Sequence, residues 1–295
     1  MTARHTNLLI VGGESDPNTQ RVVDQAHLRD VDYFFWDTDK PEACHIAWDL
    51  HVPEIDLGNV LLHPHALFNR CNVFDGDAVR NHAAFDVTES FALAWPDIRL
   101  LNRSTAGDAN NKSRNLARAR ACGFDIPDTV VLGDMTPLAG VPDPDAKIIK
   151  PLAGGDHAYV VSDLKDDESR IGKLVPQFVQ EKLDGENIRV FSIGGELFAF
   201  HLKTTEIDYR TDNDVTIHSI DVPSAIIEQI HQLVRKIGFD YCALDFRCRG
   251  GFDAPVFLEI NSFPMFVAFD DACENKLGDA ILTFLLSSDT AESAF

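Results

Sequence analysis

With 295 residues, the chain is long enough for about two domains. Its composition, 45% hydrophobic and 9% aromatic residues, is typical of a folded globular protein and excludes a disordered one. The net charge of −21 argues against nucleic acid as a partner, because binding a phosphate backbone requires a basic surface. A small anionic ligand is still possible, since a few local cations can hold it.

The cysteines and the N-terminal residues indicate the cellular compartment of the protein. No two of the six cysteines have Cys-x-x-Cys spacing, so a zinc site is not predicted. Residues 1–7 are polar and run directly into an apolar strand, which is unlike a signal peptide, and no apolar run is long enough to span a bilayer. We therefore expect a reduced, cytoplasmic setting and no membrane partner.

The first residues predict a parallel α/β unit. An apolar strand over 8–11 ends at Gly12-Gly13, a helix follows the turn at 16–18, and a second strand covers 31–36. Gly12-Gly13 lacks the rest of a Gly-x-Gly-x-x-Gly fingerprint. A tight turn, or a loop that contacts an acceptor substrate, is therefore favoured over nucleotide binding. Residues 40–100 give weaker signals, and His63-Pro64-His65 is more typical of a loop than of a metal site.

A helix is predicted over 111–122, because Gly123 and Pro127 form the expected stop signal. Lys112 falls in its first turn, where the helix dipole favours anions and not cations. This mismatch is a weak indication that Lys112 binds something else, such as a phosphate. The alternative is a solvated surface lysine.

A second lysine lies beside a glycine-rich loop. The strand over 147–151 ends in Lys150-Pro151, and Gly154-Gly155 precede the next strand at 159–161. A lysine at the end of a strand can bind a polyphosphate there, while the backbone N–H groups of the loop also contact the phosphates. No Gly-x-x-x-x-Gly-Lys-Ser/Thr pattern occurs, so a P-loop is excluded. A plain hairpin turn is the alternative.

Residues 177–203 read as an antiparallel meander with strands over 177–183, 187–193 and 196–203. Three cationic side chains lie on these strands or just after them: Arg189, Lys203 and, after a polar loop, Arg210. In so acidic a chain they suggest an anion site, although each could pair with a nearby carboxylate. A helix over 222–238 follows, and its apolar stripe predicts packing without chemistry.

The strongest signal is a hairpin over 240–261. Side chains alternate along a strand, so Asp245 lies opposite the apolar face of the first strand, and Phe257, Glu259 and Asn261 share a face of the second, with Leu258 and Ile260 opposite. If the polar faces coincide, Asp245, Glu259 and Asn261 present oxygen donors suited to Mg²⁺. A hairpin with one wet face is the alternative. A last helix is predicted over 277–286.

The order of these features resembles the ATP-grasp ligase superfamily, in particular the branch of ribosomal-protein glutamate ligases, glutathione synthetase and microviridin-type peptide ligases. The likeness spans about 102–285 and is strongest at Glu259-Ile260-Asn261 and Lys150-Pro151. It implies a mixed α/β and α+β ATP-grasp fold. The implied domains are an N-terminal parallel α/β domain (1–103), a central domain with an ATP lid (104–184) and a C-terminal lobe with an antiparallel sheet and the Mg²⁺ site (185–290).

The resemblance also implies roles for residues of this sequence. The residues that would bind ATP are Lys112, Lys150, Gly154, Gly155, Gln180, Glu181, Leu183 and Glu186, with Gln180, Glu181 and Leu183 at the adenine and Glu186 at the ribose. Asp245, Glu259 and Asn261 would ligate one or two Mg²⁺, with Mn²⁺ as a substitute. Arg189, Arg210 and Lys203 would be catalytic, with the arginines facing the transferred phosphoryl group and the substrate carboxylate.

The implied activity is an ATP-dependent, ADP-forming carboxylate–amine ligase that works through an acyl phosphate. Its substrates would be an amino acid, a small peptide or a related metabolite, and the product could also be cyclised. A non-ligating ATP sensor and a phosphotransferase are alternatives. Dimers are common in these families, so a homodimer is one expectation. Residues 262–266, Ser-Phe-Pro-Met-Phe, are bulkier than the small residues and glycine usual in the glutamate-ligase branch. The resemblance therefore does not identify the nucleophile that accepts the acyl group.

Overall fold

The computed structural model describes residues 2–40, 45–74, 77–105, 110–133, 140–152, 157–164, 176–204, 214–250, 252 and 254–287. These residues form three sheets, one after another along the chain, of six, four and five strands. Gly154, Gly155 and Arg210 lie outside the described residues. The predicted domain limits fall between the sheets, and the limits themselves remain predictions.

The first sheet has the order β2-β1-β5-β4-β3, with β6 beside β5. Its parallel part contains β1, β2, β5 and β6, as the strand-helix-strand pattern predicted. Neighbouring side chains of β1 point to opposite faces of the sheet. Leu8 and Ile10 therefore pack against α1, and Leu9 and Val11 pack against α2. The elements are β1 (Arg4–Gly12), α1 (Pro17–Leu28), β2 (Tyr33–Asp37), β3 (Ala47–Trp48), β4 (Ile55–Asp56), β5 (Leu61–Asn69), α2 (Ala78–Ala94) and β6 (Arg99–Leu100).

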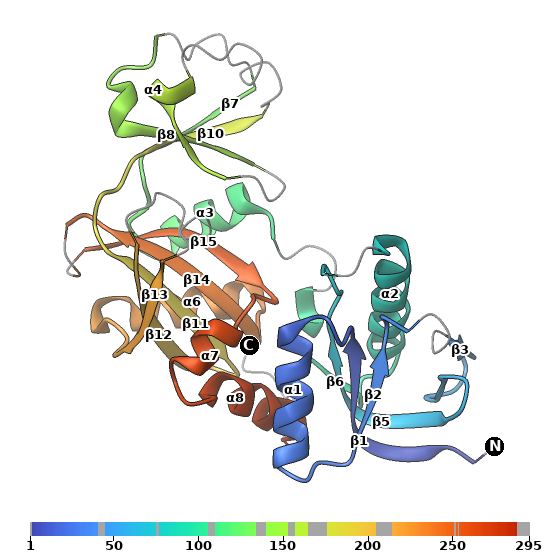
Figure 1. Cartoon of the computed structure of the whole chain (residues 1–295). Coiled ribbons are helices and arrows are strands. Elements are labelled where there is room, and N and C mark those ends of the chain that lie inside the picture. Colours follow the sequence, from blue (N-terminus) through green and yellow to red (C-terminus); the bar gives the residue numbers. More distant parts are fainter. Residues whose placement is uncertain are drawn as a thin grey trace.

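The second sheet is small and antiparallel, in the order β7-β10-β8-β9. Figure 1 shows it above the C-terminal sheet, with α4 on its outer side. A small apolar cluster that includes Ile149, Val161, Leu164 and Val179 holds it together. Its elements are β7 (Thr129–Leu132), a 3-10 turn (Pro144–Ala146), β8 (Lys147–Pro151), β9 (Tyr159–Val160), α4 (Val161–Leu164) and β10 (Gln177–Glu181).

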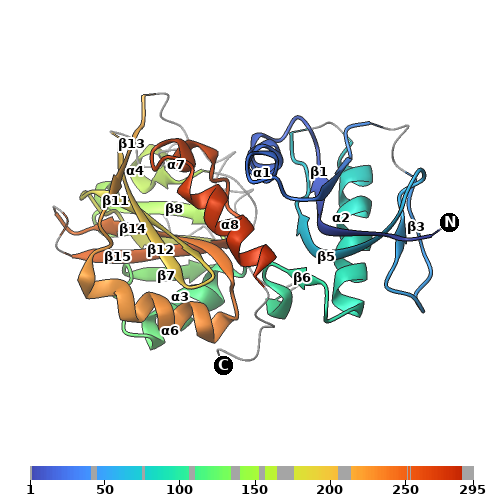
Figure 2. The same ribbon diagram turned by 90° about the horizontal axis from the view of Figure 1, so that it is seen from below.

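The third sheet, β13-β12-β11-β14-β15, is antiparallel throughout. Helices α3 and α6 cover one face, and α7 and α8 cover the other (Figure 2). Helix α8 also packs against α1 of the first domain, so one apolar core joins the two. The elements are 3-10 turns at Arg103–Thr105 and Ser224–Ile226, α3 (Lys112–Ala121), β11 (Asn187–Ile193), β12 (Glu196–Lys203), β13 (Thr216–Ile220), α6 (Ile227–Ile237), β14 (Tyr241–Cys248), β15 (Pro255–Ser262), α7 (Val267–Asp271) and α8 (Lys276–Leu286).

A β-bulge changes the predicted face of one residue in β15. Asp245 pairs with Glu259, but the next pair is Phe246 with Phe257, so Leu258 is an extra residue. Phe257 is fully buried in the core under α3 and α6, whereas Leu258 and Glu259 both line a cavity. The prediction that Phe257 shares a face with Glu259 is therefore wrong, because the bulge reverses the alternation between them.

Asn102 joins the first domain to the third sheet. It has a left-handed backbone (φ 57°) and is buried. Its side-chain Oδ1 accepts hydrogen bonds from the backbone N–H of Asp240 (2.8 Å) and Tyr241 (2.9 Å), and its Nδ2 donates to the carbonyl of Tyr241 (2.7 Å). One side chain thus satisfies three backbone groups at the start of β14.

We expect Asn102→Ala to lower the free energy of unfolding by about 3 kcal/mol, because buried backbone groups lose their partners. Asn102→Gly should be milder by about 1 kcal/mol, since glycine adopts the left-handed conformation without a Cβ clash. Urea unfolding of both variants measures the difference. Equal stability of the wild type and both variants would contradict the bracing role of Asn102.

Candidate active site

A cavity of about 510 Å³ is lined by both antiparallel sheets and by the start of α3. Each of these elements carries residues that the sequence predicted for a nucleotide or a metal. The predicted residues that line the cavity are Lys112, Lys150, Gln180, Glu181, Leu183, Arg189, Asp245, Glu259 and Asn261. The fold therefore gathers into one space residues as far apart in the sequence as Lys112 and Asn261.

The predicted metal ligands lie together on the hairpin formed by β14 and β15. Asp245 and Glu259 are direct partners across β14 and β15. Asn261 Nδ2 donates to Asp245 Oδ2 and to Glu259 Oε1, both at 3.2 Å. The positive end of an amide dipole therefore occupies the point between the two carboxylates, which shows that this point favours positive charge.

This donor set fits a hard divalent cation. The two carboxylates offer oxygen as they stand, and the Asn261 amide, whose nitrogen faces them here, would offer its oxygen after a flip about the Cβ–Cγ bond. So small a number of protein ligands leaves positions for water and phosphate, as Mg²⁺ prefers. Within the described part of the chain, no group of three or more His, Cys, Asp or Glu side chains could hold a metal. A site that depends on few protein ligands is consistent with that result.

Cations surround Glu259. Lys112 Nζ lies 3.7 Å from Glu259 Oε2. Burial alone would raise the pKa of Glu259, but Lys150, Lys112, the hydrogen bond from Asn261 and Arg189 outweigh it, and the pKa is held below its ordinary value. Glu259 is therefore ionised at neutral pH and ready to ligate a cation.

Arg189 is held rigidly on the other side of Asp245. Its Nη1 donates to both carboxylate oxygens, at 2.9 and 3.1 Å. The guanidinium carbon lies 5.3 Å from the ring centre of Phe191 and 5.2 Å from that of Phe269, so two aromatic rings flank it. A fixed cation beside two carboxylates can meet a phosphate or a substrate carboxylate without first being ordered.

The far end of the cavity is less charged. Gln180 is 1% exposed, and its Nε2 donates to Thr129 Oγ1 at 2.8 Å, while its Oε1 has no hydrogen-bond partner among the described residues. Leu183 adds a buried apolar side chain. Glu181 turns its carboxylate outward to Arg249 and to the N–H of Asp128. A surface with little charge suits an uncharged base.

Two predicted residues do not line this cavity. The Glu186 carboxylate contacts His201 Nε2 at 2.6 Å, and Lys203 is exposed at the end of β12. Their proposed roles at the ribose and in catalysis remain predictions. Gly154, Gly155 and Arg210 lie outside the residues that the structure describes, so their roles also remain predictions.

The polar cavity residues that were not assigned from the sequence include Asn187 and Arg247. Asn187 precedes Arg189 by two positions on β11, and Arg247 follows Asp245 by two positions on β14. Burial lowers the pKa of Arg247, an effect that Asp184 and Glu186 oppose. Period-two alternation was the signal that could have found both, because each shares a face with a residue already chosen.

Searches with protein-family models and among curated proteins gave no match. Among solved structures, the ATP-grasp ligase PsnB complexed with minimal precursor is 23% identical, with a TM-score of 0.74, over 94% of this chain and 99% of that chain. The macrocyclase MdnC from Microcystis aeruginosa is 19% identical, with a TM-score of 0.74, over 96% of this chain and 100% of that chain. The D-alanyl-alanine synthetase A of Vibrio cholerae is more distant, at 11% identity and a TM-score of 0.64, over 97% and 98%.

The chain has the ATP-grasp fold. The predicted fold class is thereby confirmed over nearly the whole length, including the first hundred residues, whose sequence has only a general likeness to this fold. In this fold the cavity is lined by residues of the central and C-terminal sheets. None of the helices that the structure describes has the length and apolar character needed to cross a membrane.

Proposed function

We propose that this ATP-grasp protein is an ATP- and Mg²⁺-dependent, ADP-forming carboxylate–amine ligase. The observation that supports this most is the arrangement in one cavity of Asp245, Glu259 and Asn261 facing Lys112 and Lys150. Acidic oxygen donors beside fixed lysines suit a metal-bound polyphosphate, because the metal and the lysines share its negative charge.

The cavity offers each part of ATP a matching surface. Gln180 and Leu183 would lie against the adenine base. Lys150 and Lys112 would bind the phosphates. Asp245, Glu259 and Asn261 would hold Mg²⁺, which supplies positive charge to the phosphate oxygens when bound. Glu186 at the ribose, Gly154 and Gly155 as a lid, and Lys203 and Arg210 as catalytic cations belong to the same proposal.

The chemistry needs no covalent enzyme nucleophile. A substrate carboxylate oxygen bonds to the γ-phosphorus of ATP and the bond to the bridging oxygen breaks, which gives an acyl phosphate and ADP. An amine nitrogen then bonds to the acyl carbon, phosphate departs, and the amine loses a proton. Both reactants of the first step are anions, so the contribution of Arg189 is to place positive charge where charge builds up.

The structural neighbours support an amino-acid or peptide substrate. PsnB has been solved with minimal precursor, Mg and ADP, and MdnC with its precursor peptide MdnA. We propose that the carboxylate and the amine of this protein also belong to amino acids or peptides, joined between molecules or within one. A homodimer in the cytoplasm completes the proposal, and the five described cysteines, all free, fit a reducing compartment.

An ADP-release assay tests this function. The purified protein is given ATP, Mg²⁺ and a panel of L-amino acids and short peptides, each as carboxylate alone and with an amine. ADP that appears only when both are present, together with an amide in the mass spectrum, is the expected result. ADP and a stable phosphorylated product from the carboxylate alone would favour a phosphotransferase. ATP binding without turnover on any pair would contradict the ligase and favour a sensor.

A further inference from the structure

The residues directly after the proposed metal ligands form one wall of the cavity. Ser262, Phe263, Pro264 and Met265 all line it, and Phe266 is buried behind them. We call residues 262–266 the acceptor wall, because they follow Asn261 and lie beside the proposed site of phosphoryl transfer. This is also where the sequence departs from the glutamate-ligase pattern.

Side chains from distant parts of the chain hold the backbone of the acceptor wall. Asn110 Oδ1 accepts from the N–H of Ser262 (2.9 Å), and the hydroxyl of Tyr241 donates to the carbonyl of Pro264 (3.0 Å). Residues 263–266 lie between β15 and α7 and have no regular secondary structure, so side-chain contacts satisfy backbone groups that a sheet would otherwise pair.

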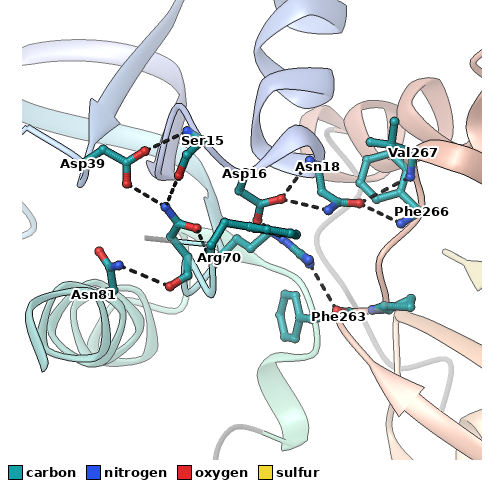
Figure 3. Close-up of polar contacts among 12 residues, drawn as sticks. Ser15, Asp16, Asn18, Asp39, Arg70, Asn81, Phe263, Phe266 and Val267 are labelled. Atoms are coloured by element: carbon teal, nitrogen blue, oxygen red, sulfur yellow. Dashed lines mark hydrogen bonds and ion pairs between the residues drawn. The ribbon is translucent and has the colours of Figure 1, made fainter. Parts of the chain in front are cut away.

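The first domain supplies the remaining contacts. Arg70 Nη1 donates to the carbonyl of Phe263 (3.1 Å), and Asn18 Oδ1 accepts from the N–H groups of Phe266 (2.7 Å) and Val267 (3.3 Å). Figure 3 shows Arg70 and Asn18 reaching from the first domain toward this segment. The ends of the wall are thus fixed by a domain that contributes no residue to the lining of the cavity.

One buried carboxylate organises both contacts. Asp16 is the N-cap of α1 and is fully buried. Its Oδ2 accepts from Arg70 Nε at 2.5 Å, and its Oδ1 accepts from Asn18 Nδ2 at 2.8 Å (Figure 3). The fork of the guanidinium lets Arg70 bind Asp16 with one nitrogen and Phe263 with another, which an ammonium group matches poorly.

The contact with Arg70 falls on a strained residue. Phe263 has φ 48°, a left-handed conformation that costs a bulky residue of order 1–3 kcal/mol and persists only when its surroundings impose it. Arg70 is 7% exposed and is the side chain that holds the Phe263 carbonyl. Phe263 lines the cavity in a strained conformation, and a side chain of the first domain holds its carbonyl. The first domain therefore helps to impose the shape of the acceptor wall.

We propose that Arg70 is a positioning residue for the acceptor subsite: through the carbonyl of Phe263 it fixes the wall against which the amine substrate binds. The inference rests on the proposed ligase function. It assigns the first domain a part in selecting the amine and not in binding ATP, because Arg70 contacts the wall and lies outside the lining of the cavity.

The test compares Arg70→Met and Arg70→Lys with a control, Arg4→Met, which removes an exposed ion pair of the same domain. For Arg70→Met we expect KM for the amine to rise on the order of tenfold, because a misplaced wall misplaces the nucleophile. KM for ATP, and the affinity for AMPPNP with Mg²⁺, should stay within about twofold. Arg70→Lys should be intermediate, and the control should match the wild type.

Two further measurements separate positioning from general loss of structure. Hydroxylamine is small enough to reach the acyl phosphate without a wall, so hydroxamate formation should be spared in Arg70→Met. Amide hydrogen exchange should accelerate over 263–267 and stay unchanged in β15. Unchanged exchange over 263–267, or equal losses for the amine, ATP and hydroxylamine, would overturn this inference alone. Absence of turnover in the wild type would overturn the proposed function and this inference with it.

Discussion

Replacement of Glu259 by glutamine is expected to lower turnover on the order of 10³-fold, equivalent to about 4 kcal/mol of transition-state stabilisation. Glutamine keeps the shape of the side chain and removes the charge that faces Lys112, Lys150 and Arg189. The depressed pKa of Glu259 means that the wild-type side chain is ionised at neutral pH, so the variant loses a full negative charge from the metal site.

ADP release at saturating ATP measures the effect, with Mg²⁺ titrated in each variant. Glu196→Gln is the matched control, because Glu196 is an exposed carboxylate of the same sheet. A Glu259→Gln protein whose turnover and Mg²⁺ requirement equal those of the control would contradict the assignment of Glu259 as a metal ligand.

Replacement of Lys150 by alanine should weaken ATP binding roughly thirtyfold, which corresponds to about 2 kcal/mol for a lost charged hydrogen bond. Lys150 lines the cavity from β8, with its Nζ 5.8 Å from the ring centre of Phe178 on the neighbouring strand. It is also the largest of the influences that lower the pKa of Glu259, so its loss should raise that pKa.

Calorimetry with AMPPNP and Mg²⁺ gives the dissociation constants. Lys147→Ala serves as the control, because Lys147 is on the same strand at an odd spacing and does not line the cavity. Equal loss of affinity in the two variants would mean that general charge, and not a specific phosphate contact, explains the effect of Lys150.

The sequence predicted most of the fold where patterns were regular. The strands at 8–11, 147–151 and 187–193, the helix at 111–122 and the hairpin beyond 240 all appear in the structure. The alternation of side chains along β14 and β15 predicted that Asp245, Glu259 and Asn261 lie together, and their hydrogen bonds show that they do. Local chemistry decides such features, and local sequence is therefore sufficient to predict them.

Features that depend on tertiary structure were missed. The bulge that turns Phe257 into the core was missed because Val256-Phe257-Leu258 is an unbroken apolar run, which does not show which of its residues faces the core. His63, Pro64 and His65 lie in β5 and not in a loop, although proline usually argues against a central strand. The contacts of Asp16, Arg70 and Phe263 join residues from opposite ends of the chain, which no local pattern can relate.

A crystal structure of the protein with AMPPNP and Mn²⁺ tests the central claim most directly, because Mn²⁺ replaces Mg²⁺ and can be located by its anomalous signal. We predict an anomalous peak between Asp245, Glu259 and Asn261, with the triphosphate within reach of Lys112 and Lys150 and the base beside Gln180. A nucleotide bound elsewhere, or a metal that leaves Glu259 and Asn261 uncoordinated, would contradict the proposed ligase site.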